Sequence, residues 1–265
     1  MIRKFRIPVL LLITISLFIV NCSKDNGLNI FTVNQDMEFG EQMSVQISES
    51  PTDYPVLSET EHPEAYTHLR RIRDALLSSD DLKYADRFDW EVKIIDDDIL
   101  NAFAAPGGYM YFYSGLIKFL DNEAQFAGVM AHEMAHADKR HSTKKLTKIY
   151  GFQILLSALL GKDPGTIAEI ATGLATGLSS LAFSRANEYE ADEFAVKYLY
   201  DTDYHPKGIS GFFEKLESHS GTPTFLSTHP SPDDRLEAID EVWTDLGGKT
   251  GETYVDQYQD FKDSL

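Results

Sequence analysis

The stretch of sequence that decides the fold lies near the middle of the chain, where residues 122–140 are NEAQFAGVMAHEMAHADKR. Its composition favours a helix, and apolar residues such as Phe126 and Met130 recur at helical spacing. Within this helix, residues 132–136 are HEMAH. Two histidines four residues apart lie about one turn apart on the same face, so both imidazoles can reach one ion. The stretch therefore predicts a helix that carries two ligands of a metal site.

Glu133, which follows His132 in the sequence, adds a carboxylate to the predicted metal site. Its carboxylate projects beside His132 and His136, toward a water molecule that the metal would bind. In a chain with 8 histidines among 265 residues, about 0.02 random matches to this pattern are expected. Two unrelated histidines in a core or on a surface therefore explain this motif poorly. A catalytic zinc ion also needs a third protein ligand and an open fourth position.

The third ligand has to come from another segment, and residues 187–192 (NEYEAD) offer carboxylates at helical spacing. Glu188 and Asp192 lie four apart on one face, whereas Glu190 lies on a different face. We assign Glu188 to the metal and Asp192 to the support of a ligating histidine, whose spare N–H such a carboxylate accepts. The alternative is a solvated helix face, which is the default interpretation of an isolated acidic pair.

Three motifs in order, HEMAH (132–136), SRANEYEAD (184–192) and STHPSPDDR (227–235), make the chain similar to a known family. Over roughly residues 35–245 it resembles the gluzincin zinc metallopeptidases of the HtpX and CAAX-prenyl-protease type, particularly the small BepA-like lipoproteins of bacterial envelopes. The resemblance implies an α+β fold that is predominantly α. This fold is a zincin-like metallopeptidase domain with a small sheet whose edge strand lines the active-site cleft. The resemblance also implies one Zn²⁺ per chain and makes Glu188, the first Glu of ExxAD, a metal ligand. The tetratricopeptide repeats of some relatives are absent from this sequence.

The resemblance also implies a substrate-binding strand. The segment similar to the family's active-site edge strand contains Asn101, Ala102, Phe103 and Ala104. Such an edge can pair with an extended polypeptide through main-chain hydrogen bonds, while pockets beside it set the side-chain preference. Polypeptides are therefore the expected substrates.

His229 and Arg235 match the family's HPxxxxR segment. In relatives the histidine lies on a loop near the metal and can occupy the open position as a self-inhibitory latch, and the arginine lies near the cleft. A neutral imidazole can ligate zinc, and an arginine can stabilise an anionic tetrahedral intermediate. Both residues are therefore candidate catalytic residues together with Glu133. The alternative is a surface loop and a helix-face arginine.

The rest of the chain is predicted to be mostly helical, with a small sheet early on. Alternating apolar residues over 88–94 are typical of a half-buried strand, and two further strands flank Pro106-Gly107-Gly108 as strand, turn and strand. Helices are predicted over residues 36–48, 61–77, 122–140 with Asp121 as N-cap, about 145–160, 165–183, about 186–199, from near Pro206, and from Ser231-Pro232 to about Leu246. Tyr254, Tyr258 and Phe261 recur at helical spacing, which predicts that the C-terminal tail docks on the domain.

The first 22 residues resemble an export signal. Arg3, Lys4 and Arg6 precede an uncharged apolar run over residues 7–20, which is shorter than the roughly 20 apolar residues of a spanning helix. The only cysteine, Cys22, follows this run, where the sequence resembles a bacterial lipobox with a lipidated cysteine. We therefore predict a lipoprotein signal peptide (1–21), a tether (22–34) and a zinc metallopeptidase domain (35–265). The alternatives are a free cysteine beside an ordinary signal or a single-pass anchor.

Composition argues against several other classes of protein. Asp and Glu number 42 against 24 Lys and Arg, and the formal net charge of -18 argues against the phosphate-binding surface that nucleic-acid affinity requires. A single cysteine allows no intramolecular disulfide and no four-cysteine metal site. The 16 Phe and 13 Tyr supply core-forming area that a disordered chain lacks. The metal site must therefore be built from histidine and carboxylate.

Together these observations predict a membrane-anchored zinc-dependent endopeptidase that hydrolyses misfolded or unassembled envelope proteins. In this hypothesis His132, His136 and Glu188 hold the zinc, and Glu133 accepts the proton of the attacking water. The expected location is the bacterial cell envelope, on the periplasmic face of the outer membrane through lipidated Cys22, with an envelope assembly complex as a candidate partner. An alternative hypothesis is a zinc-stabilised envelope chaperone or assembly factor that His229 keeps latched. A third, a degenerate non-catalytic module, is disfavoured by the retention of Glu133.

Overall fold

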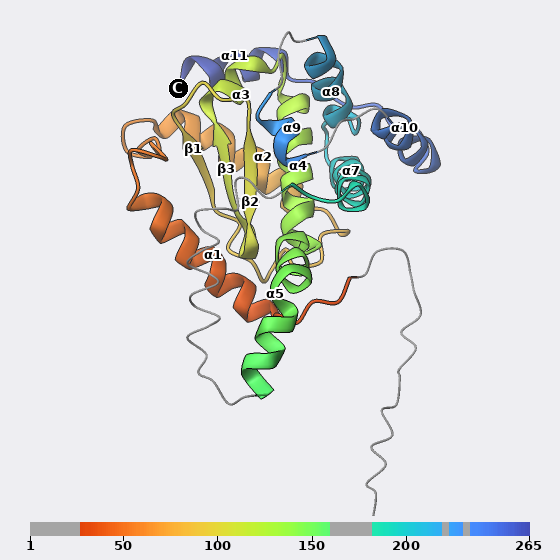
Figure 1. The fold of residues 1–265 in the computed structure, drawn as a ribbon. Coiled ribbons are helices and arrows are strands. Elements are labelled where there is room, and N and C mark those ends of the chain that lie inside the picture. The colour runs from red at the N-terminus through yellow and green to blue at the C-terminus, as the bar shows by residue number, and fades with distance from the viewer. Residues whose placement is uncertain (1–26, 160–181, 219–222, 230–233) are drawn as a thin grey trace, which may run out of the picture.

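The computed structural model describes residues 27–159, 182–218, 223–229 and 234–265 (Figure 1). The fold is α+β and predominantly α, as predicted, with a small sheet beside one central helix and further helices on that helix's other side. The strands are β1 (Val92–Ile95), β2 (Ala102–Ala105) and β3 (Tyr109–Tyr113). The helices are α1 (Val33–Ser48), α2 (Pro63–Leu77), α3 (Ser114–Phe119), α4 (Glu123–Asp138), α5 (His141–Leu159), α7 (Arg185–Tyr200), α8 (Gly208–Ser218), α9 (Phe225–Thr228), α10 (Arg235–Asp245) and α11 (Val255–Asp263).

The sheet has the strand order β1-β3-β2, so β2 is an edge strand. β1 pairs with β3 in parallel, and β2 pairs with β3 in antiparallel fashion. The short turn η1 (Pro106–Gly108) joins β2 to β3 and has φ of 76° at Gly107 and 92° at Gly108, a conformation that glycine adopts without steric cost. The predicted strand, turn and strand are confirmed.

The strand predicted over residues 88–94 is shorter and lies later in the chain. β1 begins only at Val92, because Trp90 has φ of 48° and interrupts the extended backbone before it. The indole of Trp90 is nevertheless buried and donates a hydrogen bond from Nε1 to the carbonyl of Tyr84 at 3.2 Å. The apolar alternation therefore marked core residues rather than a continuous strand.

α4 is the central helix, and its N-cap is Asn122 rather than the predicted Asp121. The Asn122 side chain accepts a hydrogen bond from the backbone N–H of Gln125 at 3.0 Å. The helix runs beside β2 and is covered on its other side by α7 and α8 (Figure 1). α8 can approach closely because Gly128 has no side chain: a Cβ there would lie 2.2 Å from the backbone nitrogen of Ile209. Tight packing on both sides buries the HEMAH residues.

α4 and α5 are separated by a break at Arg140 that the sequence did not predict. α4 ends at Asp138 and α5 begins at His141, so the predicted boundaries at residues 140 and 145 are both wrong. Arg140 has φ of 58°, in the left-handed region, which ends the first helix. Its guanidinium is fixed by the carboxylate of Asp36 and by the carbonyl of Phe31. These contacts hold the break in place.

Part of the predicted tether is packed against the domain. Asn29 and the backbone of Ile30 both donate hydrogen bonds to threonines of α5, at 2.9 and 3.1 Å. Phe31 is buried, and α1 starts at Val33 rather than at residue 36. The packed domain therefore begins before residue 35.

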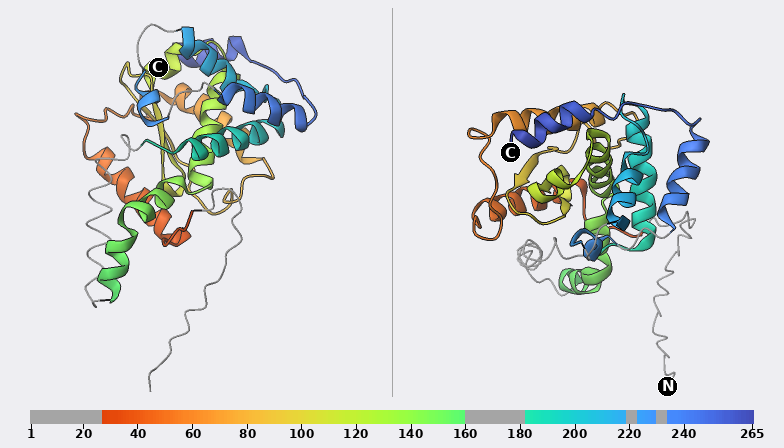
Figure 2. Two further views of the ribbon diagram at one scale, coloured as in Figure 1. Left: turned by 45° about the vertical axis from the view of Figure 1, so that its right-hand side comes forward. Right: turned by 90° about the horizontal axis from the view of Figure 1, so that it is seen from above.

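The C-terminal tail docks on the domain, as predicted. It forms α11, with Tyr258 and Phe261 fully buried and the Tyr258 hydroxyl donating to the carbonyl of Ile117 at 2.8 Å. α11 lies at the end of the molecule opposite α5, which extends from the body of the domain (Figures 1 and 2).

Several predicted features lie wholly or mostly outside the described residues: the signal peptide (1–21), Cys22, the helix over 165–183 and the helix start at Ser231-Pro232. Ala182 and Phe183, the described end of that predicted helix, are not helical. Among the helices that the structure does describe, none combines the length and apolar character needed to span a membrane.

Candidate metal centre and active site

Four side chains from three helical elements converge beside the middle of α4. His132 and His136 come from α4, Glu188 from the first turn of α7, and His229 from the residue that ends α9. One potential ligand atom from each lies within 4.8 Å of the others, and all four residues are about 1% exposed or less. The Nε2 atoms of the two α4 histidines are 3.0 Å apart, and each lies 3.6 Å from an oxygen of Glu188. The structure thus brings the three predicted ligands together, with His229 as a fourth.

The charges of this cluster suit a bound cation. Burial raises the pKa of Glu188, but the imidazoles of His229 and His132 outweigh this and hold that pKa well below its ordinary value, so the carboxylate is ionised. Burial and the neighbouring His132 keep the pKa of His136 well below 6.5, so this ring is neutral. Burial lowers the pKa of His132, yet hydrogen bonds with Asp192 and Glu188 raise it to about 9. A buried carboxylate beside a neutral imidazole and a second ring of high proton affinity attracts either a proton or a divalent metal ion.

Glu133 provides an independent observation that a metal fits here. Both of its carboxylate oxygens are buried without a hydrogen-bond partner in the described part of the chain. Burial raises the pKa of this carboxyl, an effect that the charges of His229 and His132 oppose. A buried carboxyl group without partners is costly unless water or an ion satisfies it. Its place beside the two imidazoles is the one that the HExxH pattern predicts for a general base.

Asp192 and Arg235 form a support behind the cluster. Asp192 Oδ1 lies 2.9 Å from His132 Nδ1, as predicted for a carboxylate that accepts the spare imidazole N–H. Arg235, the first residue of α10, donates to the same carboxylate from Nε at 2.6 Å and from Nη2 at 2.7 Å. Its Nη1 lies 3.0 Å from Glu188 Oε2. This placement makes Arg235 a positioning residue for two carboxylates, and its predicted stabilisation of an anionic intermediate stays a prediction.

His229 bridges the metal cluster and the general base. Its Nδ1 lies 3.2 Å from both oxygens of Glu188, and its Nε2 lies 3.4 Å from Glu133 Oε1. Its ring stacks on Phe225 with centroids 4.2 Å apart. The histidine is therefore in reach of the fourth ligand position that a latch would occupy. The surface-loop alternative for this residue is wrong, because only 1% of it is exposed.

His141 and Glu190 belong to the site, although the sequence analysis gave them no role in it. His141 Nδ1 lies 2.9 Å from His136 Nδ1, and His141 Nε2 lies 2.9 Å from Glu190 Oε2. Through these two hydrogen bonds, His141 and Glu190 support His136 as Asp192 supports His132. Residues five apart do not share a helix face, and only the left-handed Arg140 places His141 against His136. The one signal in the sequence was Glu190 itself, an acid on a different face from Glu188.

The edge strand β2 borders the site. The backbone of Ala104 faces Glu133 and contributes to lowering the pKa of its carboxyl. Ala102, Phe103 and Ala104 are in β2, whereas Asn101 precedes the strand, and its carbonyl accepts from the backbone N–H of Tyr113 at 3.2 Å. Ala102, Phe103 and Ala104 thus lie on an edge strand, Asn101 lies just before it, and their pairing with a substrate stays a prediction.

This fold and this cluster define a zincin-like metallopeptidase domain. Residues 58–243 match peptidase family M48, and the chain therefore belongs to that family.

Curated relatives include a bacterial and two mitochondrial proteins. The chain is 33% identical over 156 residues to the beta-barrel assembly-enhancing protease of Escherichia coli (strain K12), an alignment that covers 54% of this chain and 32% of the relative. It is 32% identical over 152 residues to the mitochondrial metalloendopeptidase OMA1 of Arabidopsis thaliana, covering 57% of this chain and 31% of the relative. It is 32% identical over 158 residues to the OMA1 protein of Schizosaccharomyces pombe, covering 57% of this chain and 46% of the relative. The chain thus spans less than half the length of each of these relatives.

Proposed function

We propose that the chain is a membrane-anchored zinc-dependent endopeptidase that hydrolyses peptide bonds of misfolded or unassembled proteins in the bacterial cell envelope. The observation that carries this proposal is the convergence of His132, His136 and Glu188 beside the buried carboxylate of Glu133, which accepts no hydrogen bond within the described residues. A structural metal site would need no such buried acid. The name of the Escherichia coli relative, a beta-barrel assembly-enhancing protease, supports an envelope substrate.

In the proposed mechanism each residue of the site has a separate role. When held by His132, His136 and Glu188, zinc would supply a Lewis acid that polarises the scissile carbonyl and lowers the pKa of the attacking water. Glu133 takes the proton from that water and delivers it to the leaving amine, and its raised pKa suits both transfers. Asp192 accepts the N–H of His132 and so presents the opposite nitrogen to the cluster. Arg235 holds Asp192 and Glu188 in these positions.

Substrate choice follows from the edge strand. β2 lies at the edge of the sheet and beside Glu133, so an extended polypeptide that pairs with it lies across the reacting groups. Only a chain segment that is free of its own secondary structure can pair in this way. Misfolded, stalled or unassembled proteins offer such segments.

Cys22, as the lipidated residue, would hold the domain at the membrane, on the periplasmic face of the outer membrane.

A second candidate function is a zinc-stabilised chaperone or assembly factor with latched, low protease activity. The observation that favours it is the position of His229, which contacts both Glu188 and Glu133. In that form the histidine would fill the open metal position and the enzyme would bind clients without rapid cleavage.

The test of the main proposal is casein cleavage by the full chain and by its Glu133→Gln variant. The variant keeps the three ligands and should keep its zinc, while cleavage should fall by about 10²–10⁴-fold with loss of the proton acceptor. Glu193→Gln is the matched control, because Glu193 lies on α7 with its side chain 44% exposed and should leave cleavage unchanged. Undiminished cleavage by Glu133→Gln would overturn the proposal.

A further inference from the structure

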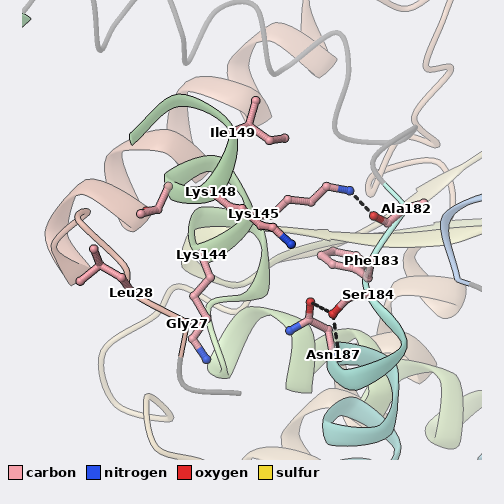
Figure 3. Close-up of a pocket in the computed structure, with 11 residues that line it drawn as sticks. Gly27, Leu28, Lys144, Lys145, Lys148, Ile149, Ala182, Phe183, Ser184 and Asn187 are labelled. Carbon is pink, nitrogen blue, oxygen red and sulfur yellow. Dashed lines mark hydrogen bonds between the residues drawn. The ribbon is translucent and has the colours of Figure 1, made fainter. Parts of the chain in front are cut away.

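A pocket of about 790 Å³ lies between α5 and the start of α7 (Figure 3), and none of the four clustered side chains lines it. Lys144, Lys145 and Lys148 of α5 line it, together with Leu28 and Ile149. We call these five residues the basic pocket surface. Figure 3 shows α5 on one side of the pocket and Ala182 to Asn187 on the other. Nothing in the proposed mechanism uses this surface.

The positive charge of the basic pocket surface is only partly balanced nearby: burial lowers the pKa of Lys144, and the carboxylate of Glu190 opposes that lowering. Lys145 donates to the backbone carbonyl of Ala182, which carries no charge. None of its three lysines forms an ion pair with a carboxylate within the described residues, although the chain as a whole has a net charge of -18. No Asp or Glu occurs between Lys139 and Lys162. Burial lowers the pKa of Lys145, and the charge of Lys148 lowers it further, as expected for cations that repel one another. The surface therefore offers a site for anions.

The same surface exposes apolar side chains. Leu28 is 75% exposed and Ile149 is 49% exposed. Outside residues 152–159, they are two of the four most exposed large apolar residues in the described ranges, and the others, Val45 and Val255, lie on α1 and α11. Lysines beside exposed Leu and Ile are typical of surfaces that enter the headgroup region of a bilayer. A purely ionic partner would not require the apolar pair.

The position of Cys22 in the sequence limits how far this surface can be from a membrane. Gly27 lines the pocket and follows Cys22 by five residues. Even a fully extended segment of that length spans at most about 18 Å. If the chain is held in a bilayer at Cys22, or by the apolar run before it, the basic pocket surface must lie close to the headgroups.

We propose that the basic pocket surface docks on an anionic phospholipid membrane, with its lysines on headgroup phosphates and with Leu28 and Ile149 in the apolar boundary. The inference rests on the membrane anchoring in the proposed function. Its consequence is an orientation of the enzyme. Phe183 lines the pocket and also stacks on His136, with ring centroids 4.0 Å apart. Docking therefore places the metal cluster directly behind the membrane-facing wall, where it acts on chains at the bilayer surface.

The test adds one cysteine at a time, at either of two positions, to the full, membrane-anchored chain. Ile149→Cys places an environment-sensitive dye on the basic pocket surface, and Val255→Cys places the same dye on α11, at the opposite end of the molecule (Figure 1). Both proteins are reconstituted in phosphatidylcholine vesicles with and without 30% phosphatidylglycerol. We expect the emission of the Ile149→Cys dye alone to shift to the blue, and only in the anionic vesicles.

Charge removal tests the role of the lysines. Each lysine near an anionic surface strengthens binding about fivefold, so replacing Lys144, Lys145 and Lys148 by Gln should lower the ratio of docked to undocked protein by about 100-fold. In the labelled Ile149→Cys protein with all three lysines present, salt at 0.5 M should reverse the blue shift. This measurement keeps the test valid if the triple variant fails to fold. A blue shift that is equal at both dye positions, absent, or independent of phosphatidylglycerol overturns the inference. So does a triple variant that docks normally but cleaves acidic peptides less well, which would assign the surface to substrate instead.

A control separates this inference from the anchor itself. Wild type carries only Cys22, so it takes up no dye if that thiol is lipidated and one dye if it is free. Labelled wild type would refute the lipid anchor, whereas unlabelled wild type with an unresponsive Ile149→Cys dye would refute the docking surface alone.

Discussion

Replacing Asp192 by Asn tests the support of the metal centre without removing a predicted ligand. The carboxylate of Asp192 meets His132 Nδ1 at 2.9 Å and two nitrogens of Arg235 at 2.6 and 2.7 Å. Asn keeps the size of the side chain but puts an NH₂ donor where an oxygen accepted. At least one of the three contacts therefore becomes donor against donor. The guanidinium then depends more on Glu188, 3.0 Å away, and draws that ligand toward itself.

The magnitude follows from the burial of this network, because Asp192 is 1% exposed and Arg235 is 2% exposed. Removing one partner of a buried ion pair costs roughly 3–5 kcal/mol of folding free energy. Loss of the carboxylate behind a ligating histidine weakens metal binding by about 10- to 100-fold. We therefore expect Asp192→Asn to fold with a lower free energy of unfolding and to bind zinc at least tenfold more weakly.

The assay is zinc competition against a chromophoric chelator, with urea unfolding of the metal-stripped protein measured in parallel. Glu193→Gln is again the control, because Glu193 is on the same helix and pairs only with Lys197, at 2.7 Å on the surface. It should change the free energy of unfolding by less than about 0.5 kcal/mol and leave zinc affinity unchanged. A zinc affinity for Asp192→Asn within twofold of wild type would refute the reasoning that this carboxylate orients His132.

Three further predictions address the latch, the charges of the site and the packing of α4. His229→Ala should raise casein cleavage about tenfold, because the variant loses the contact of His229 with the site, a latch worth about 1.4 kcal/mol. Cleavage by the variant but not by wild type would favour the chaperone alternative. In the metal-free protein the pKa of His132 is raised to about 9 from 6.5. The protonation of His132 therefore contributes fully to folding stability below pH 6.5, and this contribution is lost as the pH rises through 9. Urea midpoints that stay level or rise between pH 6.5 and pH 9 would contradict this. Gly128→Ala should cost at least about 2 kcal/mol, because its Cβ would lie 2.2 Å from the backbone of α8. Gly151→Ala in α5 meets no atom of the described residues closer than 3.6 Å and should be neutral or stabilising in the same urea measurement.

The part of the site that could be predicted depends on local periodicity. His132 and His136 share a face because they lie four apart on one helix, and Glu188 and Asp192 do so for the same reason. Nothing beyond the residue types and the 3.6-residue period is needed to place each pair. The helices α4 and α7 then pack against each other and bring the two pairs together.

The part that could not be predicted depends on single backbone conformations and on packing between distant segments. The left-handed Arg140 is held by Asp36, more than a hundred positions away, and no local pattern indicates that contact. His141 joins the site only through that break. Trp90 likewise shortens β1 by adopting a positive φ that its own residue type disfavours. Arg235 was predicted near the cleft, but its choice of Asp192 and Glu188 follows from the packing of α10 on α7.

The central claim is that His132, His136 and Glu188 hold one zinc ion on which peptide hydrolysis depends. Its most direct test is to strip the full chain of metal with a chelator and to follow casein cleavage as zinc is added back. We expect no cleavage without metal and a linear rise that saturates at one zinc per chain. Cleavage that persists in the stripped protein, or that saturates at another stoichiometry, would contradict it.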